Sequence, residues 1–216
     1  MITLLIATRN AHKVDEIRAI LGGAFRFLTL NDFPGAPKVV EDADTFAGNA
    51  TKKAMELAQW LASEKSGKRK AESGNDFVLA DDSGLEVDAL GGKPGVHSAR
   101  FAALDKNENS KDADNNANLL RLLKNVPAEK RAARFRCVIA LVKIGNQKSE
   151  IRNLFDGACE GKIIFEPRGQ NGFGYDPLFV PNGFEKTFAE LGEDVKNKLS
   201  HRAQALEKLQ KFFTTK

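Results

Sequence analysis

ITLLIATRNAHKVDEIRAILGGAFRFLTL, residues 2–30, is the stretch that decides the fold class. Its first apolar run, residues 2–7, has the length and the Ile and Leu content of a strand buried on both faces. Asn10 is a suitable cap for a helix, and apolar side chains then recur at helical spacing until a Gly-Gly pair ends the pattern. Residues 25–30 alternate apolar and polar side chains, as a second strand does. This strand–helix–strand order favours an α/β fold with some parallel pairing.

The rest of the chain adds helices and a strand-rich second half. Helices are predicted from about residue 45 to Leu61, over 115–123 and over 199–213, and strands at 77–79, 85–89, 135–142, 151–155 and 159–165. The predicted fold is therefore α/β, with a mixed, largely central twisted β-sheet flanked by helices. We expect a single domain over residues 1–216, built as two lobes that share the sheet, with the active-site cleft between them.

The composition limits the classes of protein that fit. The 216 residues include 33 basic and 29 acidic side chains, a net charge of +4, which favours an anionic ligand without requiring nucleic acid. Cys137 and Cys159 lack the spacing of a disulfide framework or a zinc site, so both are expected as buried free thiols. No apolar run reaches membrane-spanning length, and the N-terminus lacks a secretory apolar region. We therefore expect a soluble, cytoplasmic protein without a membrane partner.

An acidic stretch, Ala80-Asp81-Asp82-Ser83-Gly84-Leu85, follows the apolar residues 77–79. We expect the strand to end here and Gly84 to allow a sharp turn. Two carboxylates at a strand end suit a divalent cation such as Mg²⁺, which prefers oxygen ligands and brings substrate phosphates with it. A solvated turn explains the same residues, because Asp, Ser and Gly are ordinary turn formers. Glu41, just before a predicted helix, is placed to reach such a metal, or is simply solvated.

The segment Thr8-Arg9-Asn10-Ala11-His12-Lys13 lies where a strand gives way to a helix N-terminus. Backbone N–H groups and the helix dipole favour a phosphate at such a position. The glycine-rich cradle of a P-loop is missing. An ordinary capped helix with a surface lysine is the alternative.

Two later segments have the residues of a ligand site. Residues 169–177 place three glycines and a proline around Phe173 and Tyr175, which suits a ligand-facing loop. Flat aromatic rings stack on nucleobases and a nearby carboxylate can bind a base edge, although the two rings would equally fill the core beneath a turn. Ser200 is a plausible helix cap that puts His201 and Arg202 in the first turn, where cations oppose the helix dipole. A bound ligand explains this choice, and so does surface tolerance.

The most basic segment lies between residues 63 and 76 and contains Lys65, Lys68, Arg69 and Lys70. It shows no apolar periodicity, and no aromatic residues are interleaved with its charges. A solvated connector is therefore favoured over a nucleic-acid-binding patch.

Five strings, in family order across nearly the whole chain, resemble the inosine/xanthosine triphosphate pyrophosphatase family. They are ATRNAHK (7–13), TFAGNATKKA (45–54), ADDSGLEVDALGGKPGVHSAR (80–100), EPRGQNGFGYDP (166–177) and VKNKLSHRAQAL (195–206), of which the third and fourth are the most specific. The resemblance implies Mg²⁺-dependent hydrolysis of ITP, dITP and XTP at the α–β phosphate bond, giving the monophosphate and pyrophosphate. It also implies a homodimer.

The resemblance further implies a role for each matching residue. Asp82 would be the proton acceptor and a metal ligand, with Glu41 a second metal ligand. The substrate would be bound by Thr8, Arg9, Asn10, Ala11, His12, Lys13, Lys53, Ser83, Phe173, Gly174, Tyr175, Asp176, Lys196, His201 and Arg202. In this set Phe173 and Tyr175 would sandwich the base. A 6-keto purine offers an acceptor to His201 or Arg202, whereas the amino group of adenine leaves these donors unpaired.

Two rival functions remain open from the sequence. One is a related pyrophosphatase of modified pyrimidine nucleotides, which predicts a preference for dUTP or dTTP over dITP. The other is a basic nucleic-acid-binding module, which predicts salt-sensitive binding that survives loss of the Asp82 carboxylate.

Overall fold

The computed structural model describes residues 1–63, 76–104, 109–144 and 150–215. The basic segment with Lys65, Lys68, Arg69 and Lys70 lies outside the described residues, as does a turn expected at Gly145-Asn146.

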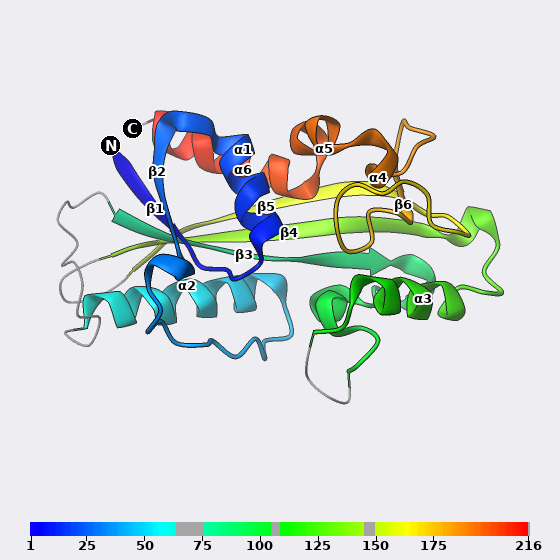
Figure 1. Cartoon of the computed structure of the whole chain (residues 1–216), viewed down its shortest axis with the longest axis horizontal. Helices are drawn as coiled ribbons and strands as arrows, with labels where there is room; N and C mark the ends of the chain where they lie inside the picture. The colour runs from blue at the N-terminus through cyan, green and yellow to red at the C-terminus, as the bar shows by residue number, and fades with distance from the viewer. Residues whose placement is uncertain (64–75, 105–108, 145–149, 216) are drawn as a thin grey trace. The chain divides into compact units, whose positions relative to one another are not determined.

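Within the described ranges, one six-stranded mixed sheet has the order β2-β1-β3-β4-β5-β6 (Figure 1). Strand β1 (Ile2–Ile6) pairs in parallel with both β2 (Phe25–Thr29) and β3 (Asp76–Val87). Strand β4 (Ala132–Lys143) lies between β3 and β5 (Glu150–Ile163), and β5 pairs antiparallel with β6 (Phe179–Pro181). The predicted mixed α/β architecture, with a central sheet and flanking helices, is confirmed.

The α-helices are α1 (Ala11–Leu21), α2 (Phe46–Ala62), α3 (Asp112–Leu122), α4 (Phe188–Leu191), α5 (Glu193–Leu199) and α6 (His201–Thr214). Helices α1 and α6 begin at the predicted caps, α2 and α3 begin within three residues of their predicted starts, and α4 and α5 were not predicted. Short 3₁₀ helices are η1 (Gly22–Ala24), η2 (Leu30–Asp32), η4 (Asp88–Leu90), η5 (Gly95–Arg100) and η6 (Ala128–Lys130). The Asn10 side chain accepts the N–H of Lys13 at 3.2 Å and so caps α1, and the Ser200 hydroxyl accepts the N–H of Ala203 at 3.2 Å at the start of α6.

Two compact units make up the chain. Unit 1 contains Met1–Asp82, Val138–Asp156 and Ala205–Lys216, and unit 2 contains Ser83–Cys137 and Gly157–Gln204. In unit 1 the Phe213 ring of α6 packs edge-on against Phe25 of β2 and Phe77 of β3, with centroid distances of 5.4 and 5.3 Å. In unit 2 the core joins strand residues to α3, and its members include Leu85, Leu119, Phe135, Phe179 and Phe188.

Two strands are longer than the sequence predicts, and each has a glycine in its interior. Strand β3 runs without a break through the acidic stretch, so the expected turn at Gly84 is wrong. A Cβ at Gly84 would clash with the carbonyl oxygen of Gly95 and the hydroxyl of Ser98. The strands expected at 151–155 and 159–165 form the single strand β5, which continues through residues 156–158. Inside the segment predicted at 159–165, a Cβ at Gly161 would clash with the Val180 carbonyl of β6. Both glycines allow close approach of neighbouring chain rather than a turn.

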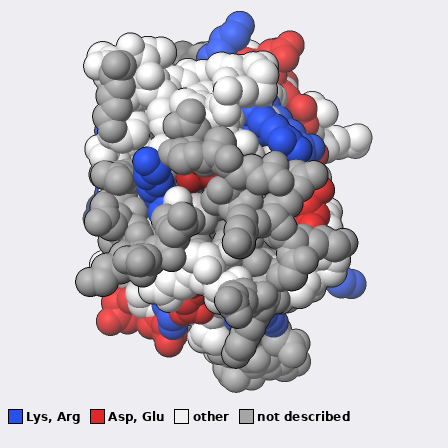
Figure 2. All heavy atoms as spheres, turned by 90° about the vertical axis from the view of Figure 1, so that its left-hand side faces the viewer, with Lys and Arg blue, Asp and Glu red and all other residues white. Residues whose placement is uncertain are grey.

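The remaining composition-based expectations concern the core and the surface. Cys137 and Cys159 are buried free thiols, as predicted. No helix of the described ranges is long and apolar enough to cross a membrane. On the face that Figure 2 shows, the described basic side chains are interspersed with acidic ones and gather into no single basic patch.

Candidate active site

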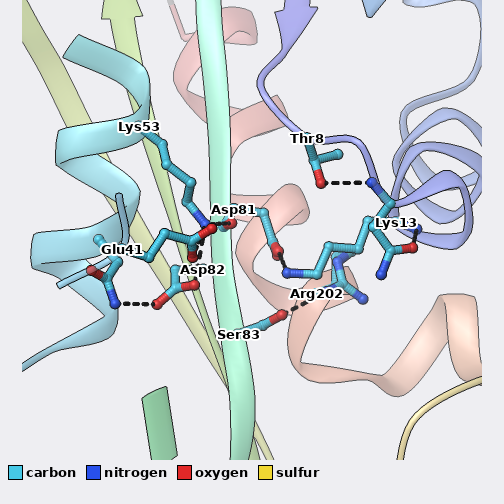
Figure 3. Close-up of polar contacts among 10 residues, drawn as sticks. Thr8, Lys13, Glu41, Lys53, Asp81, Asp82, Ser83 and Arg202 are labelled. Carbon is cyan, nitrogen blue, oxygen red and sulfur yellow. Dashed lines mark hydrogen bonds and ion pairs between the residues drawn. The ribbon is translucent and has the colours of Figure 1, made fainter. Parts of the chain in front are cut away.

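Asp81 and Asp82 are neighbours in β3, and their side chains therefore leave the strand on opposite faces. Asp81 forms an ion pair with Lys13 of α1, and the Asp81 side chain is 1% exposed. Asp82 turns to the other face, toward α2 (Figure 3). This geometry corrects the expectation of a paired-carboxylate turn, because a continuous strand separates the two carboxylates into different surroundings.

The Lys53 ammonium of α2 joins the groups around Asp82 (Figure 3). It donates to Glu41 Oε2 at 2.8 Å, to the Asp81 carbonyl at 2.8 Å and to Asp82 Oδ1 at 3.2 Å. The structure thus brings Lys53, predicted as a substrate-binding residue, together with Glu41 and Asp82, predicted as metal ligands.

Asn49 is a further member of this cluster that was not among the predicted site residues. Its amide donates to Asp82 Oδ2 at 3.3 Å, while its own oxygen accepts the N–H of Ala43 at 2.9 Å. Asn49 lies one helical turn before Lys53, so both side chains reach Asp82 from the same face of α2. That i, i+4 spacing is the sequence pattern by which it can be found.

The charges of the cluster shift its proton equilibria. Burial raises the pKa of Asp82 to about 6, with Lys53 and Lys13 opposing the rise and Glu41 and Asp81 adding to it. Burial also disfavours the Glu41 carboxylate, but Lys53, Asp82 and Lys13 together outweigh this effect and lower the pKa of Glu41. Burial disfavours the Lys53 ammonium too, and the surrounding carboxylates outweigh it, so the pKa of Lys53 is raised. A carboxylate with a pKa near 6 is suited to accept a proton at neutral pH.

The donor set at this cluster fits a magnesium ion. In the part of the chain that the structure describes, no group of three or more His, Cys, Asp and Glu side chains is arranged to hold a metal. Glu41 and Asp82 nevertheless contact the same ammonium group. Mg²⁺ commonly takes only one or two protein carboxylates and completes its shell with water and substrate phosphates. The two carboxylates of Glu41 and Asp82 meet that requirement.

The predicted phosphate-binding segment forms the entry to α1. The Thr8 hydroxyl accepts the N–H of Asn10 at 3.1 Å, and Asn10 caps the helix. Arg9, Asn10, Ala11 and His12 are exposed there, with the Lys13 side chain only 15% exposed beside Asp81. An eleven-residue helix thus presents its N-terminus beside a lysine, which suits an anion.

In unit 2, a second cluster forms around the half-buried ring of Phe173. The Lys196 ammonium lies 4.3 Å from the ring centroid and donates to Asp176 Oδ2 at 2.5 Å. The same Asp176 oxygen accepts the N–H of Phe173 at 2.8 Å. The Arg202 guanidinium carbon lies 6.0 Å from the ring centroid, and the group donates to the Ser83 hydroxyl at 2.8 Å.

His201 lies in the same unit, at the start of α6. Its ring stacks on Phe135 with a centroid distance of 4.9 Å and an interplanar angle of 12°, and the residue is 4% exposed. Ser83, Phe173, Asp176, Lys196, His201 and Arg202 all belong to unit 2. Neither His201 nor Arg202 is therefore a tolerated surface cation, because both are buried.

Tyr175 has a different place from the predicted one. It is 4% exposed, belongs to the core of unit 2, and donates its hydroxyl to the Ser98 carbonyl at 2.8 Å. Burial raises the pKa of this hydroxyl well above its ordinary value. This placement corrects the predicted two-ring sandwich and agrees with the alternative of a ring that fills the core beneath the loop.

The fold and the two clusters define the class of the protein: an α/β protein with a lysine–carboxylate cluster suited to phosphate and a basic, aromatic cluster suited to a flat ring. A Ham1 family model matches residues 4–212, and the chain belongs to this family.

Similar proteins match this chain over nearly its whole length. The dITP/XTP pyrophosphatase of Geobacter sulfurreducens is 47% identical over 207 residues, which cover 95% of this chain and 94% of that protein. The dITP/XTP pyrophosphatase of Desulforamulus reducens is 45% identical over 206 residues, with coverage of 95% and 92%. The solved structure of a HAM1 protein from Coxiella burnetii is 35% identical, matches with a TM-score of 0.80, and covers 100% of both chains.

Proposed function

We propose that this protein is a nucleoside-triphosphate pyrophosphatase that acts on dITP, ITP and XTP. It cleaves the α–β phosphate bond, releases the monophosphate and pyrophosphate, and so removes deaminated purine nucleotides from the pool. The observation that carries the proposal is the Lys53 ammonium in contact with both Glu41 and the buried Asp82. The 45% and 47% identical dITP/XTP pyrophosphatases support the choice of substrate.

The residues of unit 1 perform the proposed hydrolysis. Asp82 accepts the proton of the attacking water, for which a pKa of about 6 is suitable. Lys53 and Lys13 stabilise the negative charge that develops as the bridging P–O bond breaks, and the exposed N–H groups at the start of α1 bind the phosphates. Glu41 and Asp82 would hold Mg²⁺, which when bound neutralises phosphate charge.

The residues of unit 2 determine which base the protein binds. Phe173 stacks on the purine, and His201 or Arg202 donates to its 6-keto oxygen. Adenine carries an amino group at that position, so a buried donor would lose its partner. Lys196 and Asp176 fix the loop and its ring by their mutual ion pair. We also expect a homodimer in the cytoplasm, which light scattering and cell fractionation test.

The deciding experiment compares pyrophosphate release from dITP, XTP, dATP and dUTP in the presence of Mg²⁺. We expect dITP to exceed dATP by about 100-fold in kcat/KM, as a polar mismatch in a buried site allows. Asp82→Asn should lower kcat by roughly 10³-fold, because it removes a general base. Asp42→Asn is the matched control, because Asp42 is an exposed acid directly after Glu41 and pairs with Lys52.

Three results would contradict the proposal. Equal rates with dITP and dATP would remove the base selectivity, and orthophosphate as the first product would move the cleaved bond. A preference for dUTP would favour the pyrimidine pyrophosphatase instead.

A further inference from the structure

Gly174 is bound through both of its backbone groups by one face of α3. Its N–H donates to Asp112 Oδ2 at 2.6 Å, and its carbonyl accepts from the Asn116 amide at 3.0 Å. Asp112 and Asn116 are four residues apart, so their side chains lie one above the other on the helix. Gly174 itself has a φ of +64°, a conformation that glycine adopts without strain.

The residues on either side of Gly174 are fixed as well. The N–H of Phe173 is bound by Asp176, and the hydroxyl of Tyr175 is bound by the Ser98 carbonyl. Gly174 and Tyr175 are thus anchored to two separate parts of unit 2, α3 and η5, and Phe173 is bound within its own loop. Since Tyr175 is in the core, Phe173 is the loop's half-buried aromatic ring, and the backbone at Gly174 helps to set its direction.

We infer that Asp112 and Asn116 are positioning residues for base recognition. They hold Gly174 from both sides and thereby keep the Phe173 ring where the purine stacks. The inference rests on the proposed function, in which Phe173 binds the base. Neither residue touches the substrate, so each acts through the loop. Their effect therefore falls on binding of the base and leaves the phosphate-binding groups of unit 1 unchanged.

Asp112 accepts a hydrogen bond from Gly174, whereas Asn116 donates one to it, so each contact can be tested by its own substitution. Asp112→Asn keeps an oxygen that accepts the N–H of Gly174, whereas Asp112→Ala removes it. Asn116→Asp keeps the shape but sets an acceptor against the Gly174 carbonyl. Asp114→Asn is the control, because Asp114 is an exposed acid in the same first turn of α3.

The first measurement is steady-state hydrolysis of dITP, with inhibition by tripolyphosphate, which has no base. Asp112→Ala and Asn116→Asp should each raise the KM about tenfold and leave kcat within about twofold. The first removes a charge-assisted hydrogen bond and the second replaces a donor by an acceptor, and both changes weaken binding equally in the ground and transition states. Asp112→Asn and Asp114→Asn should stay near the wild type. Tripolyphosphate inhibition should be the same throughout. If Asp112→Asn is as damaging as Asp112→Ala, or tripolyphosphate inhibition weakens in parallel, the inference is wrong.

The second measurement needs no activity. Amide hydrogen exchange at Gly174 in the nucleotide-free protein should speed up by about tenfold in Asp112→Ala and stay unchanged in Asp114→Asn. Unchanged exchange in Asp112→Ala overturns the positioning role even if the wild type hydrolyses dITP. Faster exchange in Asp112→Ala, together with a wild type that releases no pyrophosphate, would support the anchoring and refute the proposed function.

Discussion

The Asp82 side chain is 8% exposed, and its surroundings disfavour its charge. Its pKa rises from an ordinary 3.8 to about 6, so between these pH values the folded protein binds more protons than the unfolded chain. The contribution of Asp82 to stability therefore falls as the pH rises through this window and is constant above it. A shift of this size corresponds to about 3 kcal/mol of unfolding free energy.

We accordingly predict that Asp82→Asn stabilises the nucleotide-free and metal-free protein at pH 8. The gain should be on the order of 1–2 kcal/mol, less than the full shift, because the amide makes poorer contacts with Lys53 and Asn49. It should shrink as the pH is lowered toward 4, where the wild-type carboxyl is protonated. Urea unfolding of both proteins across this pH range measures the difference. A gain that grows toward low pH would show that the folded state favours the carboxylate.

At the residue scale the sequence was informative where chemistry and resemblance coincided. Glu41 and Asp82 were predicted as metal ligands and Lys53 as a substrate-binding residue, and the structure places the three side chains in contact. Asp112 and Asn116 were missed because they are 62 and 58 residues from Gly174 in the chain, and no local pattern marks such a contact. Tyr175 was misplaced because a ring that faces a ligand and a ring that fills a core have the same sequence surroundings.

At the scale of elements, the four longer helices were predictable, whereas the short helices α4 and α5 and the continuity of the strands were not. Caps such as Asn10 and Ser200 act locally, so the sequence shows where α1 and α6 begin. Gly84 has poor intrinsic strand preference, yet it lies inside β3. It is accommodated there by a tertiary contact with Gly95 and Ser98 that a local pattern does not contain.

Gly84→Ala tests this explanation for β3. The added methyl group would meet the backbone oxygen of Gly95 and the hydroxyl of Ser98, so one of these segments must move. We expect the free energy of unfolding to fall by about 2 kcal/mol, as overpacking typically costs. Gly23→Ala is the control, because a Cβ at Gly23 has no neighbour within 4 Å. Urea denaturation of the two variants decides the matter, and equal midpoints would refute the close-approach explanation.

At the scale of the whole molecule, the two units share strands. Each of β3, β4 and β5 contributes residues to unit 1 and to unit 2. If one unit unfolds, it therefore disrupts the same three strands that the other unit needs. The sequence indicated two lobes that share a sheet, but the boundaries inside individual strands depend on long-range pairing.

Shared strands predict a single cooperative unfolding transition. The chain has one tryptophan, Trp60 in unit 1, and one tyrosine, Tyr175 in unit 2, so each unit has its own probe. Trp60 fluorescence and the ¹⁹F signal of fluorotyrosine at position 175 should give the same urea midpoint. Separate midpoints would show that the units unfold independently.

The position of Lys53 has a consequence for the order in which ligands arrive. Without any ligand, its ammonium group already compensates the charge of Glu41 and Asp82. A lone divalent cation would have to compete with this built-in cation and would gain little. A triphosphate brings its own negative charge and gives the ammonium group another partner. We therefore expect metal and nucleotide to enter as one complex.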